Sequence, residues 1–225
     1  MQDFFINSIL VTAIALAFLL VLALPAAYVL SRYKFRGQKF LNVCFMAGIF
    51  VNLSYLVVPI FLMLSEADKF LGKTFGMKQF LLNNHVVLAL VYASTSLAFT
   101  VFLLSSYFKT LPKDFEEAAY VDGASYFRTM VSIMFPMAKP SILTVILFQF
   151  LAYWNEYALA LTLLADEKKY TLSVGLLNLM NAQKAAATYG QLYAGLVVVM
   201  LPTFILYMLV QKQLTQGMTA GGVKG

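Results

Sequence analysis

The chain has 225 residues, of which 61% are hydrophobic and 12% charged, and its mean hydropathy is +0.80. A soluble domain carries about 25% charged residues, so this composition argues against a water-soluble globular protein. The formal net charge of +6 does not indicate nucleic-acid binding, because the basic residues lie in separate segments between apolar runs. The apolar surplus predicts a protein whose main solvent is lipid.

Long apolar runs occur along the chain, and each could cross a bilayer, which takes about 20 helical residues. They must be helices, because backbone amides in lipid find no water and the runs lack the alternation of barrel strands. We predict an all-α polytopic transmembrane helix bundle, a single transmembrane domain over residues 1–225. Its five predicted spans are about 4–30, 40–64, 86–108, 142–164 and 189–210.

The first span differs from a signal peptide, because no Lys or Arg precedes it and its apolar run is too long. The basic residues predict the topology. With five spans, ten Lys and Arg fall on one side of the membrane and six on the other. The short first loop, SRYKFRGQK, belongs to the richer side, and short loops follow the positive-inside rule best. We expect a cytoplasmic C-terminus and an N-terminus outside.

The segment 110–140, between the third and fourth spans, is charged but patterned for helices. Pro112 suits a first helical position, and the carboxylates that follow it favour a helix N-terminus. Gly123 should end this helix in the left-handed conformation, and Ser125 should cap a second one. The residues expected to share one apolar face of the second helix are Phe127, Met130, Val131 and Met134.

The chain lacks the residue constellations that enzymes and metal sites need. It has one histidine, His85, and one cysteine, Cys44, so we predict no catalytic residue and no metal site. The tripeptide Gly72-Lys73-Thr74 looks like the end of a phosphate-binding loop, but Ala67 stands where that motif needs glycine. If ATP drives this protein, another chain must hydrolyse it.

The sequence EEAAYVDGASYFRTMVSIMFPMAKP resembles the EAA loop of binding-protein-dependent ABC importer permeases. That loop reads Glu-Ala-Ala, three residues, Gly, nine residues, then Ile-x-Leu-Pro, and here Phe135 replaces the leucine. The matching residues are Glu117, Ala118, Ala119, Gly123, Ile133 and Pro136. The resemblance implies a type I ABC importer permease fold, in which this helix docks on an ATPase subunit and passes its motion to the spans.

Two further stretches resemble maltose-type sugar permeases. The tail Met218–Gly225 is similar to the family's C-terminus, which reaches into the ATPase dimer interface, although its glycines alone predict an extended end. The residues expected to face the ATPase are Thr219, Gly221, Gly222 and Lys224. The segment Trp154-Asn155-Glu156-Tyr157 is similar to the WNE segment of these sugar permeases.

The resemblance implies the permease subunit of an ATP-driven sugar importer in the bacterial inner membrane. Its expected partners are a second, homologous permease, an ATPase dimer that uses ATP and Mg, an extracytoplasmic sugar-binding protein, the carbohydrate substrate and lipid. The chain itself would bind no cofactor. Family members have six core spans, and the first would be absent here, which agrees with the N-terminus predicted outside.

Glu156 is the main candidate in the substrate path. A carboxylate inside a span costs on the order of 2.5–3.5 kcal/mol, so it should face protein or water. Gln149, Tyr153 and Glu156 share one helical face that could bind sugar hydroxyls, and Asn155 points elsewhere but is also a candidate. A hydrogen-bond cluster with the partner permease explains this face equally well. Trp154 could be an interfacial anchor.

Two other functions stay open at this stage. The chain could be a secondary transporter driven by an ion gradient, with Glu156 as the ion site, although no internal repeat supports this. It could also be a membrane scaffold that binds a cytoplasmic partner through the 110–140 helices. Substrate-stimulated ATP hydrolysis in an assembled complex would separate the importer from both.

Overall fold

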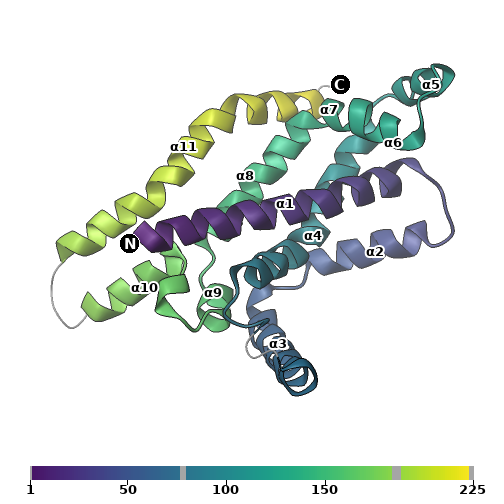
Figure 1. Cartoon of the computed structure of the whole chain (residues 1–225). Helices are drawn as coiled ribbons and strands as arrows, with labels where there is room; N and C mark the ends of the chain where they lie inside the picture. The colour runs from purple at the N-terminus through teal and green to yellow at the C-terminus, as the bar shows by residue number, and fades with distance from the viewer. Residues whose placement is uncertain (1, 77–79, 184–188, 223–225) are drawn as a thin grey trace. The chain divides into compact units, whose positions relative to one another are not determined.

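The computed structural model describes residues 2–76, 80–183 and 189–222, and all regular structure within them is helical. Figure 1 shows the order of the helices along the chain. They are α1 (Gln2–Arg32), α2 (Gln38–Ile49), α3 (Leu53–Phe75), α4 (His85–Thr110), α5 (Asp114–Val121), α6 (Tyr126–Thr129), the π-helix η1 (Met130–Met134), α7 (Phe135–Met137), α8 (Lys139–Asn155), α9 (Ala158–Leu163), the 3-10 helix η2 (Glu167–Lys169), α10 (Leu172–Gln183) and α11 (Tyr189–Gly222). The predicted all-α class is confirmed.

Two of the helices in the described part of the chain, α1 and α4, are long and apolar enough to cross a membrane. The number rises to four if each of two bent pairs forms one span. These pairs are α2 with α3, bent by 103°, and Tyr126–Met137 with α8, bent by 72°. The predicted spans 4–30 and 86–108 therefore correspond to single helices, and 189–210 lies within α11.

The prediction of a continuous helix over 40–64 is wrong. α2 ends at Ile49, and α3 begins after Asn52, whose backbone is extended and whose side-chain oxygen accepts a 2.9 Å bond from the Ser54 amide. An asparagine in this position caps a new helix, which is why the chain turns here. α3 then continues to Phe75, well beyond the predicted end of the span.

The prediction of a continuous helix over 142–164 is also wrong, because α8 ends at Asn155 and the short α9 begins at Ala158. The segment that follows α9 contains a further helix, α10. An interrupted helix inside an apolar run needs partners for its freed backbone groups.

The chain divides into two compact units. The first consists of Met1–Phe18, Asn52–Thr95 and Gln149–Tyr207. Its core is formed by Trp154, Leu172 and Val199, packed by phenylalanines that include Phe5 and Phe150. The Trp154 indole donates a 3.0 Å bond to the Val199 carbonyl and stacks on Phe150 at 5.3 Å. The prediction that Trp154 is an interfacial anchor is wrong, since its side chain closes this core.

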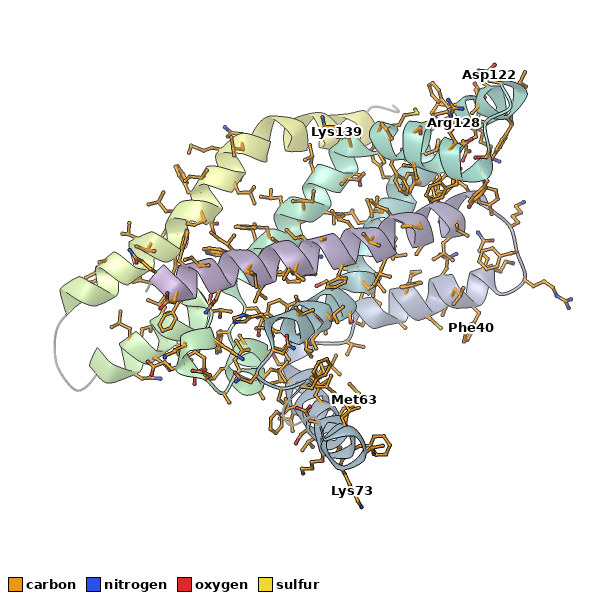
Figure 2. The ribbon with its side chains drawn as sticks, viewed as in Figure 1. Phe40, Met63, Lys73, Asp122, Arg128 and Lys139 are labelled. Atoms are coloured by element: carbon orange, nitrogen blue, oxygen red, sulfur yellow. The ribbon has the colours of Figure 1, made fainter. Side chains whose placement is uncertain are left out.

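The second unit consists of Leu19–Val51, Ser96–Phe148 and Met208–Gly225. Tyr28 and Phe108 are fully buried in it, and their rings meet edge to face at 5.6 Å. The Ser105 hydroxyl donates a bond to the carbonyl of Ala27, which brings α4 against α1 within this unit. α2, described throughout its length, buries none of its residues, and Phe40 points outward from it (Figure 2). Such apolar exposure is typical of a surface that faces lipid or another subunit.

Candidate functional site

α5 is the first helix of the predicted EAA loop, and its acidic first turn favours a helix N-terminus. It begins at Asp114, two residues after the predicted start at Pro112, because the carbonyl of Lys113 is the first to accept helical bonds. It ends at Val121. Gly123 then has a φ of +76°, which confirms the predicted left-handed turn.

α5 has two different faces. Glu116 and Ala119 are its two buried residues, with 8% and 4% of their surface exposed. Glu117 and Ala118 are exposed, and Val121 is 88% exposed. The structure therefore separates the Glu-Ala-Ala triplet, because its last alanine packs inward while the first two residues are free for a partner.

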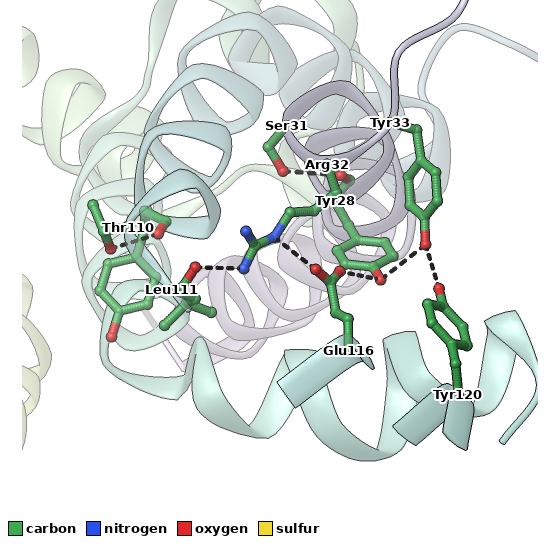
Figure 3. Close-up of polar contacts among 9 residues, drawn as sticks. Tyr28, Ser31, Arg32, Tyr33, Thr110, Leu111, Glu116 and Tyr120 are labelled. Carbon is green, nitrogen blue, oxygen red and sulfur yellow. Dashed lines mark hydrogen bonds and ion pairs between the residues drawn. The ribbon is translucent and has the colours of Figure 1, made fainter. Parts of the chain in front are cut away.

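The buried face of α5 is held to the end of α1 by polar contacts around Glu116 (Figure 3). The Tyr28 hydroxyl donates a 2.6 Å bond to one carboxylate oxygen, and Arg32 Nε lies 3.4 Å from the other. The same guanidinium donates to the Leu111 carbonyl at 2.8 Å. The Arg32 and Glu116 side chains are 4% and 10% exposed, and charges this buried are tolerated only when paired and bonded.

A second tyrosine extends this contact. The hydroxyls of Tyr33 and Tyr120 share a hydrogen bond of 2.7 Å, and Tyr33 also lies 3.3 Å from the Tyr28 hydroxyl. Burial, and then the hydrogen bond to Tyr120, raise the pKa of Tyr33 above its ordinary value of 10.0. The Tyr33 hydroxyl therefore keeps its proton and its place in the network at physiological pH.

α5 is followed by a second helix, which starts at α6 and continues through η1 and α7. We call these two helices the 110–140 hairpin. Ser125 caps it as predicted, because its hydroxyl accepts a backbone amide bond at 3.3 Å. The single apolar face predicted for four residues is wrong, since Met130 and Met134 are buried but Phe127 and Val131 are 68% and 40% exposed. A π-helix closes wider turns than an α-helix, so side chains in η1 no longer follow the 3.6-residue period.

The remaining EAA-loop candidates lie along this second helix. Ile133 is half-buried in η1, and Pro136 is exposed in α7. Figure 2 shows Asp122 and Arg128 near the end of the α5–α6 hairpin. The structure thus places Pro136 and the Glu117 side of α5 on exposed surface of the second unit.

Glu156 lies at the break in the predicted fourth span. Its carboxylate accepts bonds from the amides of Leu159 at 2.8 Å and Ala160 at 3.2 Å, so it caps the first turn of α9. The Tyr92 hydroxyl donates a third bond at 2.6 Å. A carboxylate is stabilised at a helix N-terminus by the helix dipole and the free amides, which explains how the chain tolerates this break.

Two of the other path candidates are buried in the first unit. Gln149 and Tyr153 are each 5% exposed, and Tyr153 stacks on Tyr92 with ring centres 5.3 Å apart. Tyr92 therefore brings Tyr153 and Glu156 together. Asn155 is exposed, and its amide donates to a carbonyl one turn back along α8.

Asn155 lines a mainly apolar groove of about 300 Å³. The groove is formed by Leu151 and Asn155 of α8 and by α11 residues between Val199 and Tyr207. Thr203 and the rings of Phe204 and Tyr207 are among these α11 residues. An amide, a hydroxyl and aromatic rings in one groove are groups that can contact a sugar.

The C-terminal tail differs from its prediction. Thr219, Gly221 and Gly222 lie in α11, so the expectation of an extended tail is wrong up to Gly222. A helix that has already formed gains one backbone bond for each residue added, and this offsets the poor helix propensity of glycine. Lys224 lies outside the described residues.

Sequence reasoning missed Glu116, Arg32 and Tyr28 as functional candidates. Glu116 stood next to the selected Glu117, and Arg32 entered only the topology count. The available signal was the pair of adjacent glutamates at the start of a short helix, because adjacent residues on a helix point to different faces.

Comparison with known proteins identifies the family. Residues 19–220 match the binding-protein-dependent transport system inner membrane component. The chain belongs to this family. It is therefore the permease component of an ABC importer, a multi-pass inner-membrane protein that works with a separate ATPase and a binding protein. The permease itself is not the ATPase, and the family carries no bound cofactor.

Several relatives of this permease are named for saccharide transport. It is 34% identical over 218 residues to the diacetylchitobiose uptake system permease protein NgcG of Streptomyces coelicolor, covering 97% of this chain and 68% of that one. It is 31% identical over 219 residues to the trehalose/maltose transport system permease protein MalG of Thermococcus litoralis, covering 97% and 74%. A bacterial ABC transporter involved in the import of the acidic polysaccharide alginate matches with a TM-score of 0.73 and 26% identity, covering 94% and 74%.

Proposed function

We propose that this permease forms half of the translocation path of an ATP-driven importer of oligosaccharides or related carbohydrates, and that α5 couples it to the ATPase. The observation that carries the proposal is the two-faced α5. Glu117 and Ala118 are exposed, while Glu116 holds the opposite face to α1. An exposed carboxylate can pair with a basic residue of the ATPase, and an exposed alanine lets a partner backbone approach closely.

The carbohydrate class is supported by the relatives. The two named permeases belong to uptake systems for diacetylchitobiose and for trehalose and maltose, and the structural relative imports alginate. All of these substrates are saccharides. We extend this class to the present permease by analogy with its family, without assigning a particular sugar.

We propose a substrate path that includes Gln149, Tyr153, Asn155 and Glu156. Aromatic rings can stack on sugar rings, and amide or carboxylate oxygens can accept bonds from sugar hydroxyls. The stacked Tyr92 and Tyr153 beside Glu156, and the groove beside Asn155, provide groups of this kind. The alternative for Glu156 is a hydrogen-bond cluster without substrate contact, because its carboxylate also caps α9.

We propose that the chain acts as one transmembrane domain of five spans, with its N-terminus outside and its C-terminus in the cytoplasm. The 110–140 hairpin and the tail residues Thr219, Gly221, Gly222 and Lys224 then lie on the ATPase side. A second, homologous permease would complete the path. ATP binding would close the ATPase dimer, move α5 and shift the pair from an inward-facing to an outward-facing state.

The test is co-purification of the tagged permease, expressed from its native operon, with comparison of wild type and Gly123→Asp. Gly123 has positive φ, so aspartate there strains the turn and adds a charge beside the docking face. Gly76→Asp is the matched control, because Gly76 also has positive φ and open space around it but ends α3. We expect Gly123→Asp to lose the ATPase and the uptake of labelled disaccharides, and Gly76→Asp to keep both.

Three results would count against the proposal. If no ATPase co-purifies with the wild type, α5 is not a docking helix. If Gly123→Asp retains ATPase and uptake like the wild type, the 110–140 hairpin does not couple the two subunits. If the wild-type complex hydrolyses ATP in response to its binding protein but imports no saccharide, the carbohydrate class is wrong. Membership in a transport family already disfavours the ion-driven and scaffold alternatives.

A further inference from the structure

We propose that Glu116, Arg32 and Tyr28 form a transmission contact that passes the movement of α5 to α1. In this role Glu116 is a positioning residue that acts through α1, whereas Glu117 on the opposite face meets the ATPase. The inference rests on the proposed docking of α5, and it names the residues through which that docking reaches a long apolar helix.

α5 buries little apolar surface within its unit. It is eight residues long, and its two buried residues are Glu116 and the small Ala119. A helix this short is not stable alone, so its position depends on tertiary contacts. Among the described contacts of α5 with α1 and the residue that follows α1, the polar ones are those of Glu116 and Tyr120.

The contact between Glu116 and α1 should resist both sliding and rotation of α5. The two oxygens of Glu116 meet two residues of α1, Tyr28 and Arg32, which are one helical turn apart on the same face. Arg32 also holds the Leu111 carbonyl in the segment that leads into α5. α1 therefore contacts both the buried face of α5 and the segment that precedes α5.

The contact between Glu116 and α1 should remain intact when α5 is displaced. Separating the pair would leave the charges of Glu116 and Arg32 buried without a partner, which is strongly unfavourable. Hydrogen bonds to charged groups are also stronger where water is excluded. A load applied to the exposed face of α5 should therefore move the end of α1 with it rather than break the contact.

The packing of Tyr28 keeps this contact rigid. The side chain is fully buried, and its ring meets Phe108 at the end of α4 and Tyr126 at the start of α6, at 5.6 and 6.0 Å. The Tyr28 hydroxyl, which donates to Glu116, is thus held in one position. Tyr28→Phe would preserve this packing and remove the bond to the carboxylate, together with the 3.3 Å contact between the hydroxyls of Tyr28 and Tyr33.

The test compares Glu116→Gln and Tyr28→Phe with the wild type in the complete complex with ATPase and binding protein, reconstituted in proteoliposomes. We expect both variants to retain the ATPase, because the Glu117 face is unchanged, and to import at least tenfold fewer sugar molecules per ATP hydrolysed. Ser105→Ala is the matched control, since it removes another buried bond to α1, the one to Ala27, without touching α5. Its transport ratio should stay at the wild-type value.

A rescue experiment separates transmission from folding. In a Cys44→Ser background, Tyr33→Cys and Tyr120→Cys place thiols at two positions whose tyrosine hydroxyls meet at 2.7 Å, and a reducible bifunctional thiol reagent that spans the space of the two removed rings can join the end of α1 to α5. Added to Glu116→Gln, this link should restore the transport ratio, and reduction should abolish it again. A defect in folding would not be repaired reversibly.

The outcomes are distinguishable. If the wild type retains no ATPase, the proposed docking fails and this inference fails with it. If the wild type is coupled and Glu116→Gln and Tyr28→Phe keep its transport ratio, only the transmission contact is wrong. If the ratio falls but the reversible link does not restore it, Glu116 has a structural role and the inference is overturned.

Discussion

The Tyr92 hydroxyl of α4 donates a 2.6 Å hydrogen bond to the carboxylate of Glu156, which also caps the first turn of α9. One acidic residue thus satisfies three donors from two segments of the first unit. An acid in an apolar span first suggests an ion or substrate site, but here its oxygens already have protein partners.

Replacing Glu156 with alanine should lower the melting temperature of the purified permease in detergent. The change removes the acceptor of three hydrogen bonds, and a buried donor left unsatisfied costs about 1–3 kcal/mol of unfolding free energy. In a chain of this size, each kcal/mol lowers the melting temperature by about 2–4 °C. Glu156→Gln should cost less, because its amide oxygen still accepts. Glu167→Ala, at an exposed glutamate in η2, is the control. Equal melting of Glu156→Ala and wild type would show that the cap contributes nothing.

Trp154 is the single tryptophan and is 2% exposed, so the intrinsic fluorescence reports directly on the core of the first unit. We expect emission at short wavelength and weak quenching by aqueous acrylamide in the folded protein, because the indole is packed against Phe5 and Phe150. The comparison is Trp154→Phe combined with Phe127→Trp, since Phe127 is 68% exposed and lies outside the predicted spans. Stronger quenching of Trp154 than of the new tryptophan would contradict this core.

Gly175→Ala should destabilise the first unit by about 1–3 kcal/mol through overpacking. A Cβ at this position would overlap the ring of Phe4. Thermal unfolding of Gly175→Ala should therefore occur at lower temperature, and a second change, Phe4→Leu, should recover part of the loss. Gly190→Ala is the control, because no atom lies within 4 Å of its added Cβ. If both alanine variants melt alike, the close approach of Phe4 is not maintained.

The pKa of Tyr33 is raised by burial and by its bond to Tyr120. The folded protein therefore keeps this proton at pH values where the unfolded chain, with an ordinary value of 10.0, has lost it. Stability from this group is complete below about pH 10 and is lost as the pH rises further. Between pH 8 and pH 12, the melting temperature of Tyr33→Phe should fall less steeply than that of the wild type. A slope for Tyr33→Phe equal to that of the wild type would refute the assignment.

Much of the 110–140 hairpin could be predicted because turns depend on local chemistry. Gly123 adopts its left-handed conformation and Ser125 caps the next helix, as their neighbours in sequence indicated. The apolar face of that helix could not be predicted, because η1 changes the helical period through packing. The predictions of continuous helices over 40–64 and 142–164 were also wrong. Hydropathy records how apolar a run is, but it does not show where a side chain such as Asn52 or Glu156 starts a new helix.

The sequence by itself determined that this chain is a helical membrane protein and indicated the family to which it belongs. Both follow from local properties: the length of apolar runs, and the spacing of Glu117, Gly123 and Pro136. Only the tertiary structure decided that Glu116 faces α1 while Glu117 is free, and that Glu156 is a cap. Those outcomes depend on Tyr28 and Tyr92, which lie 88 and 64 residues away along the chain from the carboxylates they bind. Contacts at such separations arise from packing, which no local pattern in the sequence records.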